Sequence, residues 1–261
     1  MFISMRLRAA AHGGWRSGPV MPLVLAFALV ACAGASGRAA PQPGFFDDLN
    51  RHDKARWERS DGWSNGEWVG CSWAGDHVVF DQDRMTLVLD DREGVDKPLS
   101  CGEYRTREHL HYGRYEVSMK AARADGLVTA FFIYTGPAFG DPWHETTIEI
   151  LGRDTTRVQF TLFVDGEHYP TTIDLDFDAA EDFHTYAIEW LPDAVRWYVD
   201  GRLVHEDVAA DQPIPSVPGR IFTSLWNGAD SLKDWLGRFR YEGEPITAAY
   251  EWIRYTPLGE Q

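Results

Sequence analysis

Residues 184–206, with the sequence HTYAIEWLPDAVRWYVDGRLVHE, contain three short β-strands in succession. Residues 184–190 and 195–199 are short runs with many aromatic and β-branched residues, which are typical of strands. A Leu-Pro-Asp-Ala turn separates these two strands. Asp200-Gly201 is a dipeptide typical of a tight hairpin and leads into a third strand at 202–206. The segment therefore predicts an antiparallel meander.

The remainder of the chain from Phe45 onward follows the same pattern. Residues 115–120 alternate as a half-buried strand, and residues 128–134 are apolar enough for a strand buried on both faces. Residues 221–226 and 250–255 predict later strands, and no long segment has the helical period. Many short strands at close spacing predict an all-β fold, a β-sandwich or jelly roll, in one domain over 45–261.

The amino end has the features of an export signal. Arg6, Arg8 and Arg16 precede an apolar run over 21–31, which is shorter than the roughly 20 residues that span a bilayer. A basic stretch, an apolar core and small residues predict a secretory signal peptide over 1–31. Residues 32–44 are small and flexible in composition and predict a tether.

The last residues of this signal, Leu29-Val-Ala-Cys32, resemble the lipobox of bacterial lipoproteins. The resemblance implies that the Cys32 thiol carries lipid and that the chain is cleaved before it. An ordinary signal peptide that happens to contain a cysteine is the alternative. A lipid anchor would place the protein in the cell envelope, at the outer membrane or periplasmic face, and its absence would leave the protein extracellular.

The net charge of the chain is −15 at pH 7, which limits the class of partner. Such a chain repels a phosphate backbone, so nucleic acid is excluded as the expected partner. A polyanionic glycan is disfavoured for the same reason, and a neutral polysaccharide fits.

Cysteine use agrees with export. If Cys32 carries lipid, Cys71 and Cys101 remain as one pair in an oxidising compartment. A disulfide between them would close a loop of about 30 residues and contribute roughly 3–4 kcal/mol. The alternative is two buried free thiols.

The chain contains 11 Trp, and most of these rings are expected in the core. Trp63, Trp226 and Trp235 instead stand beside Gly, Asn or Asp in contexts typical of turns. Flat rings next to polar groups are what a sugar-binding groove needs.

Two carboxylates stand out in residues 143–152, WHETTIEILG. On a strand, Glu145, Thr147 and Glu149 share one face, while Ile148 and Ile150 point to the other and predict a core contact. The two Glu Cα atoms would lie about 13 Å apart. Retaining glycosidases need carboxyl groups only about 5–5.5 Å apart, which leaning side chains on a curved sheet can reach. The alternative is a solvated strand face.

This segment resembles the active-site strand of the bacterial lichenases of glycoside hydrolase family 16, whose pattern is Trp-Asp-Glu-Ile-Asp-Ile-Glu-Phe-Leu-Gly. Further segments in family order are Asp61–Gly66, Cys71–Trp73, Cys101–Arg105, Tyr115–Ala121, Phe131–Pro137, Arg153–Phe160, Trp197–Gly201, Leu225–Gly228 and Asp234–Gly237. The resemblance covers nearly the whole domain. It implies a curved, concanavalin A-like jelly roll with an open substrate groove, and a retaining endo-β-glucanase.

The resemblance also assigns residues. It implies that Glu145 is the nucleophile, that Glu149 is the acid/base, and that Cys71 and Cys101 form the family's disulfide. It implies groove positions for Asn65, Glu103, Arg105, Tyr134, Trp143, Trp226 and Trp235. No cofactor is required for catalysis and no catalytic metal is expected. Family members often carry a structural calcium ion, and Glu251 stands where an Asp ligand is expected.

The chain departs from the family pattern at the centre of the strand, where Thr147 replaces an Asp that supports the two carboxylates. A like charge raises the pKa of a neighbouring carboxyl, so its loss predicts that Glu149 ionises at lower pH and that turnover falls. Thr161 and Ser224 replace Asn, and Phe163 replaces Tyr. His144 also replaces an Asp. Lost polar contacts weaken recognition of particular hydroxyls, so lichenan itself is not assured as the substrate.

Three functions remain open at this point. The first is hydrolysis of a β-1,3/1,4-type glucan or a related exopolysaccharide. The second is transglycosylation, in which a sugar hydroxyl replaces water. The third is a non-catalytic glycan-binding envelope lipoprotein. A monomer is expected in each case.

Overall fold

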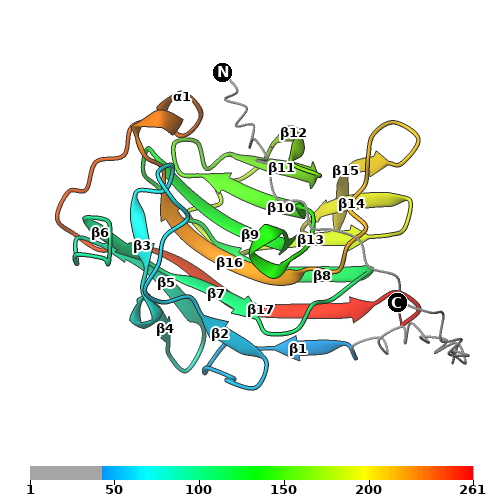
Figure 1. Ribbon diagram of the computed structural model, residues 1–261, viewed down its shortest axis with the longest axis horizontal. Helices are drawn as coiled ribbons and strands as arrows, with labels where there is room; N and C mark the ends of the chain where they lie inside the picture. Colours follow the sequence, from blue (N-terminus) through cyan, green and yellow to red (C-terminus); the bar gives the residue numbers. More distant parts are fainter. Residues whose placement is uncertain (1–42, 261) are drawn as a thin grey trace, which may run out of the picture. The chain divides into compact units, whose positions relative to one another are not determined.

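The computed structural model describes residues 43–260, and in this part of the chain it confirms the all-β prediction. Seventeen strands form two sheets that pack face to face (Figure 1). The predicted signal peptide, Cys32 and most of the tether lie outside the described residues.

The larger sheet has ten strands, and most of its neighbours are antiparallel. Its main path is β15 (Arg202–Val208), β14 (Ala194–Val199), β13 (His184–Trp190), β8 (Gly113–Lys120), β17 (Ile246–Pro257), β5 (Met85–Asp90), β6 (Leu99–Cys101) and β3 (Cys71–Trp73), with β1 (Phe45–Asp47) paired to β17 and β4 (Val78–Phe80) paired to β5.

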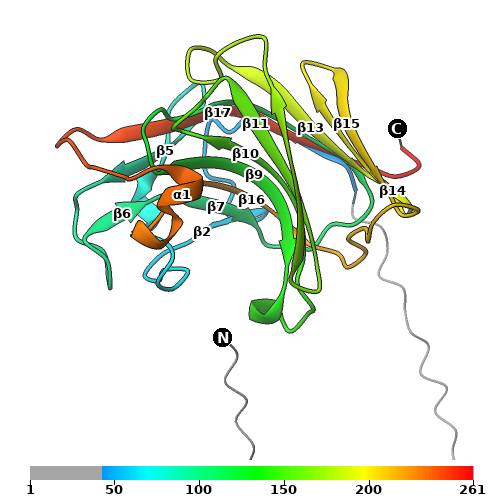
Figure 2. The ribbon, with the colours of Figure 1, turned by 90° about the horizontal axis from the view of Figure 1, so that it is seen from above.

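The smaller sheet has seven strands and carries the candidate site. Its order is β12 (Glu167–Asp174), β11 (Arg157–Val164), β10 (His144–Leu151), β9 (Leu127–Thr135), β16 (Arg220–Asn227), β7 (Glu103–Thr106) and β2 (Trp57–Arg59). Strands β9, β10 and β11 curve strongly along their length (Figure 2). The predicted curved sandwich is therefore confirmed.

The meander predicted from residues 184–206 is present as β13, β14 and β15, each antiparallel to the next. Asp200 and Gly201 have φ angles of 47° and 76°, both in the left-handed region. Two successive positive φ angles define the hairpin turn for which Asp-Gly is suited. The sequence signal was therefore sufficient for this part of the fold.

The core lies between the two sheets and includes large aromatic rings. Trp57, Tyr104, Phe131, Trp197 and Tyr250 are all almost fully buried. Trp197 and Tyr250, on the larger sheet, also make hydrogen bonds to the backbone of the smaller sheet. The Trp197 indole N–H donates to the carbonyl oxygen of Thr147 at 3.2 Å, and the Tyr250 hydroxyl donates to the carbonyl of Ala130 at 3.1 Å. The larger sheet thereby holds β10 and β9 from behind.

Helical segments are few and short in the described residues. They are the 3₁₀ turns η1 (Gly75–His77), η2 (Pro137–Phe139) and η3 (Asp230–Leu232) and the single-turn helix α1 (Lys233–Leu236). Within residues 43–260 no helix has the length and apolar character needed to cross a membrane.

The Cys71–Cys101 disulfide is confirmed. It joins the parallel strands β3 and β6, with the two Cα atoms 5.9 Å apart. The alternative of two free thiols is therefore excluded.

Candidate active site

The antiparallel register around β10 arranges the site as rows of side chains on one face of the smaller sheet. Glu149 is paired with Ala130 on β9 and with Gln159 on β11, and Ala130 continues to Ser224 on β16. Ser224 in turn is paired with Glu103 on β7. Directly paired residues share a face, so this row runs from Gln159 to Glu103 across five strands.

Two parallel rows complete the grid. Thr147 is aligned with Phe132, Phe222 and Arg105, and Glu145 is aligned with Tyr134 and Phe163. The opposite face of β10 carries Thr146, Ile148 and Ile150, all buried, as the sequence predicted.

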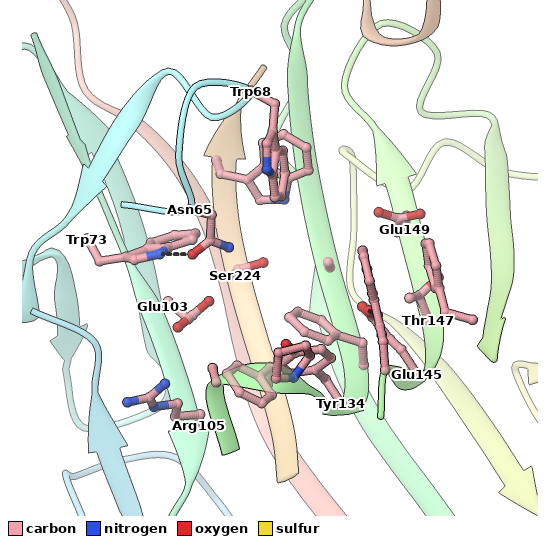
Figure 3. Close-up of a pocket in the computed structure, with 18 of the residues that line it drawn as sticks. Asn65, Trp68, Trp73, Glu103, Arg105, Tyr134, Glu145, Thr147, Glu149 and Ser224 are labelled. Atoms are coloured by element: carbon pink, nitrogen blue, oxygen red, sulfur yellow. Dashed lines mark hydrogen bonds between the residues drawn. The ribbon is translucent and has the colours of Figure 1, made fainter. Parts of the chain in front are cut away.

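These rows form the floor of a groove of about 600 Å³. In Figure 3, Glu145, Thr147 and Glu149 line one side, and Asn65, Trp73, Glu103 and Arg105 lie opposite them. All ten residues predicted for the site line this one groove: Asn65, Glu103, Arg105, Tyr134, Trp143, Glu145, Thr147, Glu149, Trp226 and Trp235. The structure thus brings together residues that are up to 170 positions apart in the sequence.

The Glu145 carboxyl group accepts a hydrogen bond at Oε2 from the indole N–H of Trp143, at 2.8 Å. Burial at the base of the groove raises the pKa of Glu145 to about 8, with a further increase from the charges of Glu149 and Glu103. The Trp143 hydrogen bond acts in the opposite sense because it stabilises the ionised carboxylate.

Glu149 lies in a similar setting with a different donor. Its Oε2 accepts a hydrogen bond from the side-chain amide of Gln159 at 3.2 Å. Burial raises the pKa of Glu149 to about 7, and the Gln159 hydrogen bond partly opposes this rise. Near neutral pH the pair therefore retains a proton that ordinary carboxyl groups would have lost, and general acid catalysis requires one such proton.

A third carboxyl group faces them from β7. Glu103 is 2% exposed, it accepts a hydrogen bond from Ser60 Oγ, and burial raises its pKa to about 7. Beside it, the Arg105 guanidinium pairs with Glu58 at 2.8 Å and lies 5.6 Å from the centre of the Trp63 ring. This wall offers charged hydrogen-bonding groups to a ligand.

Aromatic rings form both ends of the groove. At one end the Trp143 and Phe163 rings stack with centroids 5.1 Å apart and nearly parallel planes. At the other end Trp226 contacts Trp68 at 5.3 Å and Trp235 at 6.3 Å. Trp63, Trp68 and Trp143 remain more than a third exposed, so their rings are available to the apolar faces of sugars.

Sequence reasoning missed several lining residues. Phe132 and Phe222 stack on the groove floor with ring centroids 4.9 Å apart. From the sequence, the apolar strands that contain them predicted only a place in the core. Trp73 lines the groove and donates to the side-chain oxygen of Asn65 at 3.1 Å. Gln159 was also missed, although its place two residues from Thr161 on one strand face is a signal that cross-strand pairing with Glu149 could have used.

Thr147 occupies the centre of the grid and is 2% exposed. Its buried hydroxyl group acts on the pKa of Glu149 in the same sense as Gln159, by favouring the ionised carboxylate against the larger effect of burial. The raised pKa of Glu149 thus arises from burial, without a charged residue at position 147.

A calcium ion is not supported by the residues present. The Glu251 carboxylate, expected near such an ion, accepts a hydrogen bond from Ser118 Oγ at 2.7 Å. In the part of the chain that the structure describes, no group of three or more His, Cys, Asp or Glu side chains could hold a metal ion. We therefore assign no step to a metal.

A β-sandwich with paired carboxyl groups and aromatic rings in a groove belongs to the class of proteins that bind and cleave polysaccharides. Comparison with known proteins narrows this class. Residues 65–251 match the family described as Glycosyl hydrolases family 16. A β-glucanase of Bacillus subtilis (strain 168) is 42% identical over 236 residues, which cover 88% of this chain and 91% of that protein.

Solved structures of β-glucanases support the same family. A prokaryotic β-1,3-1,4-glucanase (lichenase) derived from a mouse hindgut metagenome superposes with a TM-score of 0.78 at 39% identity, covering 83% of this chain and 100% of that chain. The β-glucanase of Bacillus licheniformis superposes with a TM-score of 0.77 at 40% identity, and the match covers 82% of this chain and 98% of that chain. The chain belongs to glycosyl hydrolases family 16 and is a glycoside hydrolase.

Proposed function

We propose that this chain is a retaining endo-β-glucanase that cleaves internal bonds of a β-1,3/1,4-type glucan or a related extracellular polysaccharide. Glu145 is the nucleophile and Glu149 the acid/base. The observation that carries the proposal is the placement of both carboxyl groups on one face of β10, deep in one groove, together with the raised pKa of Glu149, which a general acid needs. The relatives named β-glucanase and lichenase support the substrate class.

In the first step, protonated Glu149 donates its proton to the glycosidic oxygen as the bond to the anomeric carbon breaks. The Glu145 carboxylate attacks that carbon and forms a glycosyl ester, and the leaving chain departs as an alcohol. The Trp143 N–H bond to Glu145 Oε2 favours the ionised form that this attack needs. In the second step, ionised Glu149 takes a proton from water, which attacks the anomeric carbon and releases Glu145.

The residues that line the groove also influence which glucan is cleaved. Phe163 and Ser224 line it where longer polar side chains stand in the family pattern, and Phe132 and Phe222 form an apolar floor. We propose that binding depends more on contact with apolar sugar faces than on individual hydroxyls. Ligands with the same backbone and altered substitution are then accepted with similar KM values.

A screen of β-glycans for new reducing ends tests this function. We expect release of oligosaccharides from a mixed-linkage β-glucan, with retention of the β-anomer in the first product seen by NMR. The Glu145→Gln variant is the control, and we expect it to bind the glucan without cleaving it. Binding by both proteins and cleavage by neither would identify a glycan-binding protein in place of an enzyme.

We further propose that the protein is exported through its signal over 1–31 and is anchored by lipid at Cys32, as a monomer. The Leu-Val-Ala-Cys32 sequence and the Cys71–Cys101 disulfide support this location. Metabolic labelling with a fatty acid should mark the wild-type protein and spare a Cys32→Ser variant. Light scattering of the soluble domain should give the mass of one chain.

A further inference from the structure

A chain of hydrogen bonds leads from α1 to the carboxyl group of Glu149. The indole N–H of Trp235 donates to Oε1 of Gln159 at 3.0 Å. The Gln159 amide then donates through Nε2 to Glu149 Oε2 and to Thr161 Oγ1, each at 3.2 Å. Helix α1 contributes Trp235, strand β11 contributes Gln159 and Thr161, and strand β10 contributes Glu149.

The chemistry of the donors fixes the orientation of the amide. An indole N–H can only donate, so the atom of Gln159 that faces Trp235 must be the carbonyl oxygen. The NH₂ group therefore faces Glu149, which receives a donor at Oε2. Oε1 is left as the oxygen that carries the transferable proton.

Trp235 is held in place from its backbone. Arg153 Nη1 donates to the carbonyl oxygens of Asp234 and Trp235, at 3.2 and 3.1 Å. The adjacent Leu236 side chain is fully buried. The indole N–H is thus positioned by the protein itself, before any sugar enters the groove.

We propose that Gln159, oriented by Trp235, is a positioning residue that fixes the Glu149 carboxyl group and determines which of its oxygens carries the proton. This inference rests on the proposed role of Glu149 as acid/base. Trp235 then does more than stack against sugar, because its N–H prevents the Gln159 amide from rotating. With a reversed amide, the carbonyl oxygen would face Glu149 and would favour its protonated form.

The carboxyl groups of Glu145 and Glu149 are thus held by different hydrogen-bond arrangements. Trp143 donates to Glu145 directly, whereas Trp235 acts on Glu149 through Gln159. The other charged groups around these hydrogen bonds are Glu145, Glu103 and Arg105 in the groove and, in the adjoining cleft lined by Gln159 and Trp235, Arg153, Asp154, Arg157 and Asp234. None of them is altered by the variants below.

The test compares Trp235→Phe and Gln159→Leu with the wild type, using kcat/KM against pH on two substrates. One is a β-glucan polymer, whose sugar leaving group needs a proton. The other is a 2,4-dinitrophenyl β-glycoside of a gluco-oligosaccharide, whose leaving group does not. Trp226→Phe is the matched control, because that ring lies beside Trp235 and its N–H is outside the chain of hydrogen bonds.

We expect both variants to move the basic limb of the polymer profile upward by about half to one pH unit, because Gln159→Leu removes the donor to the ionised carboxylate and Trp235→Phe frees the Gln159 amide to rotate away from it. Polymer kcat/KM should fall about tenfold, while the formation of the glycosyl ester from the dinitrophenyl substrate changes less than about twofold. Trp226→Phe should raise KM and leave the basic limb in place.

An unmoved basic limb in both variants, or equal losses with both leaving groups, would overturn the positioning role. A Glu149→Ala variant separates this outcome from failure of the proposed function. We expect Glu149→Ala to lose polymer cleavage and to form a glycosyl azide from the dinitrophenyl substrate when azide is added. Full polymer activity in Glu149→Ala would instead show that Glu149 is not the acid/base.

Discussion

Replacement of Thr147 by Asp places a third carboxylate between the two on β10. Residues two apart on a strand lie roughly 7 Å apart between Cα atoms. Two like charges about 6 Å apart interact by about 3 kcal/mol at an effective dielectric constant near 20. This energy corresponds to about two pH units, and contact of the groove with solvent reduces it to about one.

The sign of the effect follows from the charge. A negative group at position 147 disfavours the ionised form of Glu149, so its pKa rises from about 7 toward roughly 8. Protonated Glu149 then persists to higher pH. The basic limb of kcat/KM on a β-glucan should move upward by about one pH unit, and turnover above neutral pH should increase.

The assay is the pH dependence of reducing-end release. Thr147→Asn is the matched control because it has nearly the size and shape of Asp and no charge. Thr147 is 2% exposed, so thermal unfolding of both variants must first establish that the fold is kept. A basic limb in Thr147→Asp that coincides with that of Thr147→Asn would refute the electrostatic reasoning.

Three further changes probe stability. Replacing both Cys71 and Cys101 by Ser should lower the free energy of unfolding by roughly 3–4 kcal/mol and Tm by about 10 °C in calorimetry, and an unchanged Tm would contradict the loop-closure argument. The folded-state pKa of Glu103 is raised from 4.5 to about 7, so its ionisation should reduce stability by about 3 kcal/mol as pH rises across that window. Urea unfolding at pH 5 and 8 should reveal this loss in the wild type and a smaller one in Glu103→Gln. Trp197→Phe removes the bond to the Thr147 carbonyl and leaves unfilled volume, so urea unfolding should give a loss of about 2 kcal/mol, and no loss would show that the bond is dispensable.

The strand pattern was predictable because it depends on local alternation. Residues two apart on a strand share a face, so the sequence indicated that Glu145 and Glu149 lie on one face and that Ile148 points to the core. The Asp200-Gly201 turn was equally local, since its left-handed conformation is a property of these two residue types.

The full site was less accessible to sequence reasoning. Phe132 lies in a run that predicted burial on both faces, and only curvature of the sheet opens the groove above it. Gln159 meets Glu149 through the register of two strands, and Trp235 meets Gln159 through the path of a short helix. The spacing of Gln159 and Thr161 indicates a shared strand face, but it does not give the register with β10, and nothing in the sequence indicates the contact with Trp235.

The sequence by itself determined the all-β class, the face of β10 on which the two carboxyl groups lie, and the family to which the chain is similar. Only the tertiary structure decided that Glu103 faces Glu145 and Glu149 across one groove and that burial raises all three pKa values. The physical reason is that alternation along a strand is set by backbone geometry. Desolvation and hydrogen-bond partners depend instead on which distant segments close over a group.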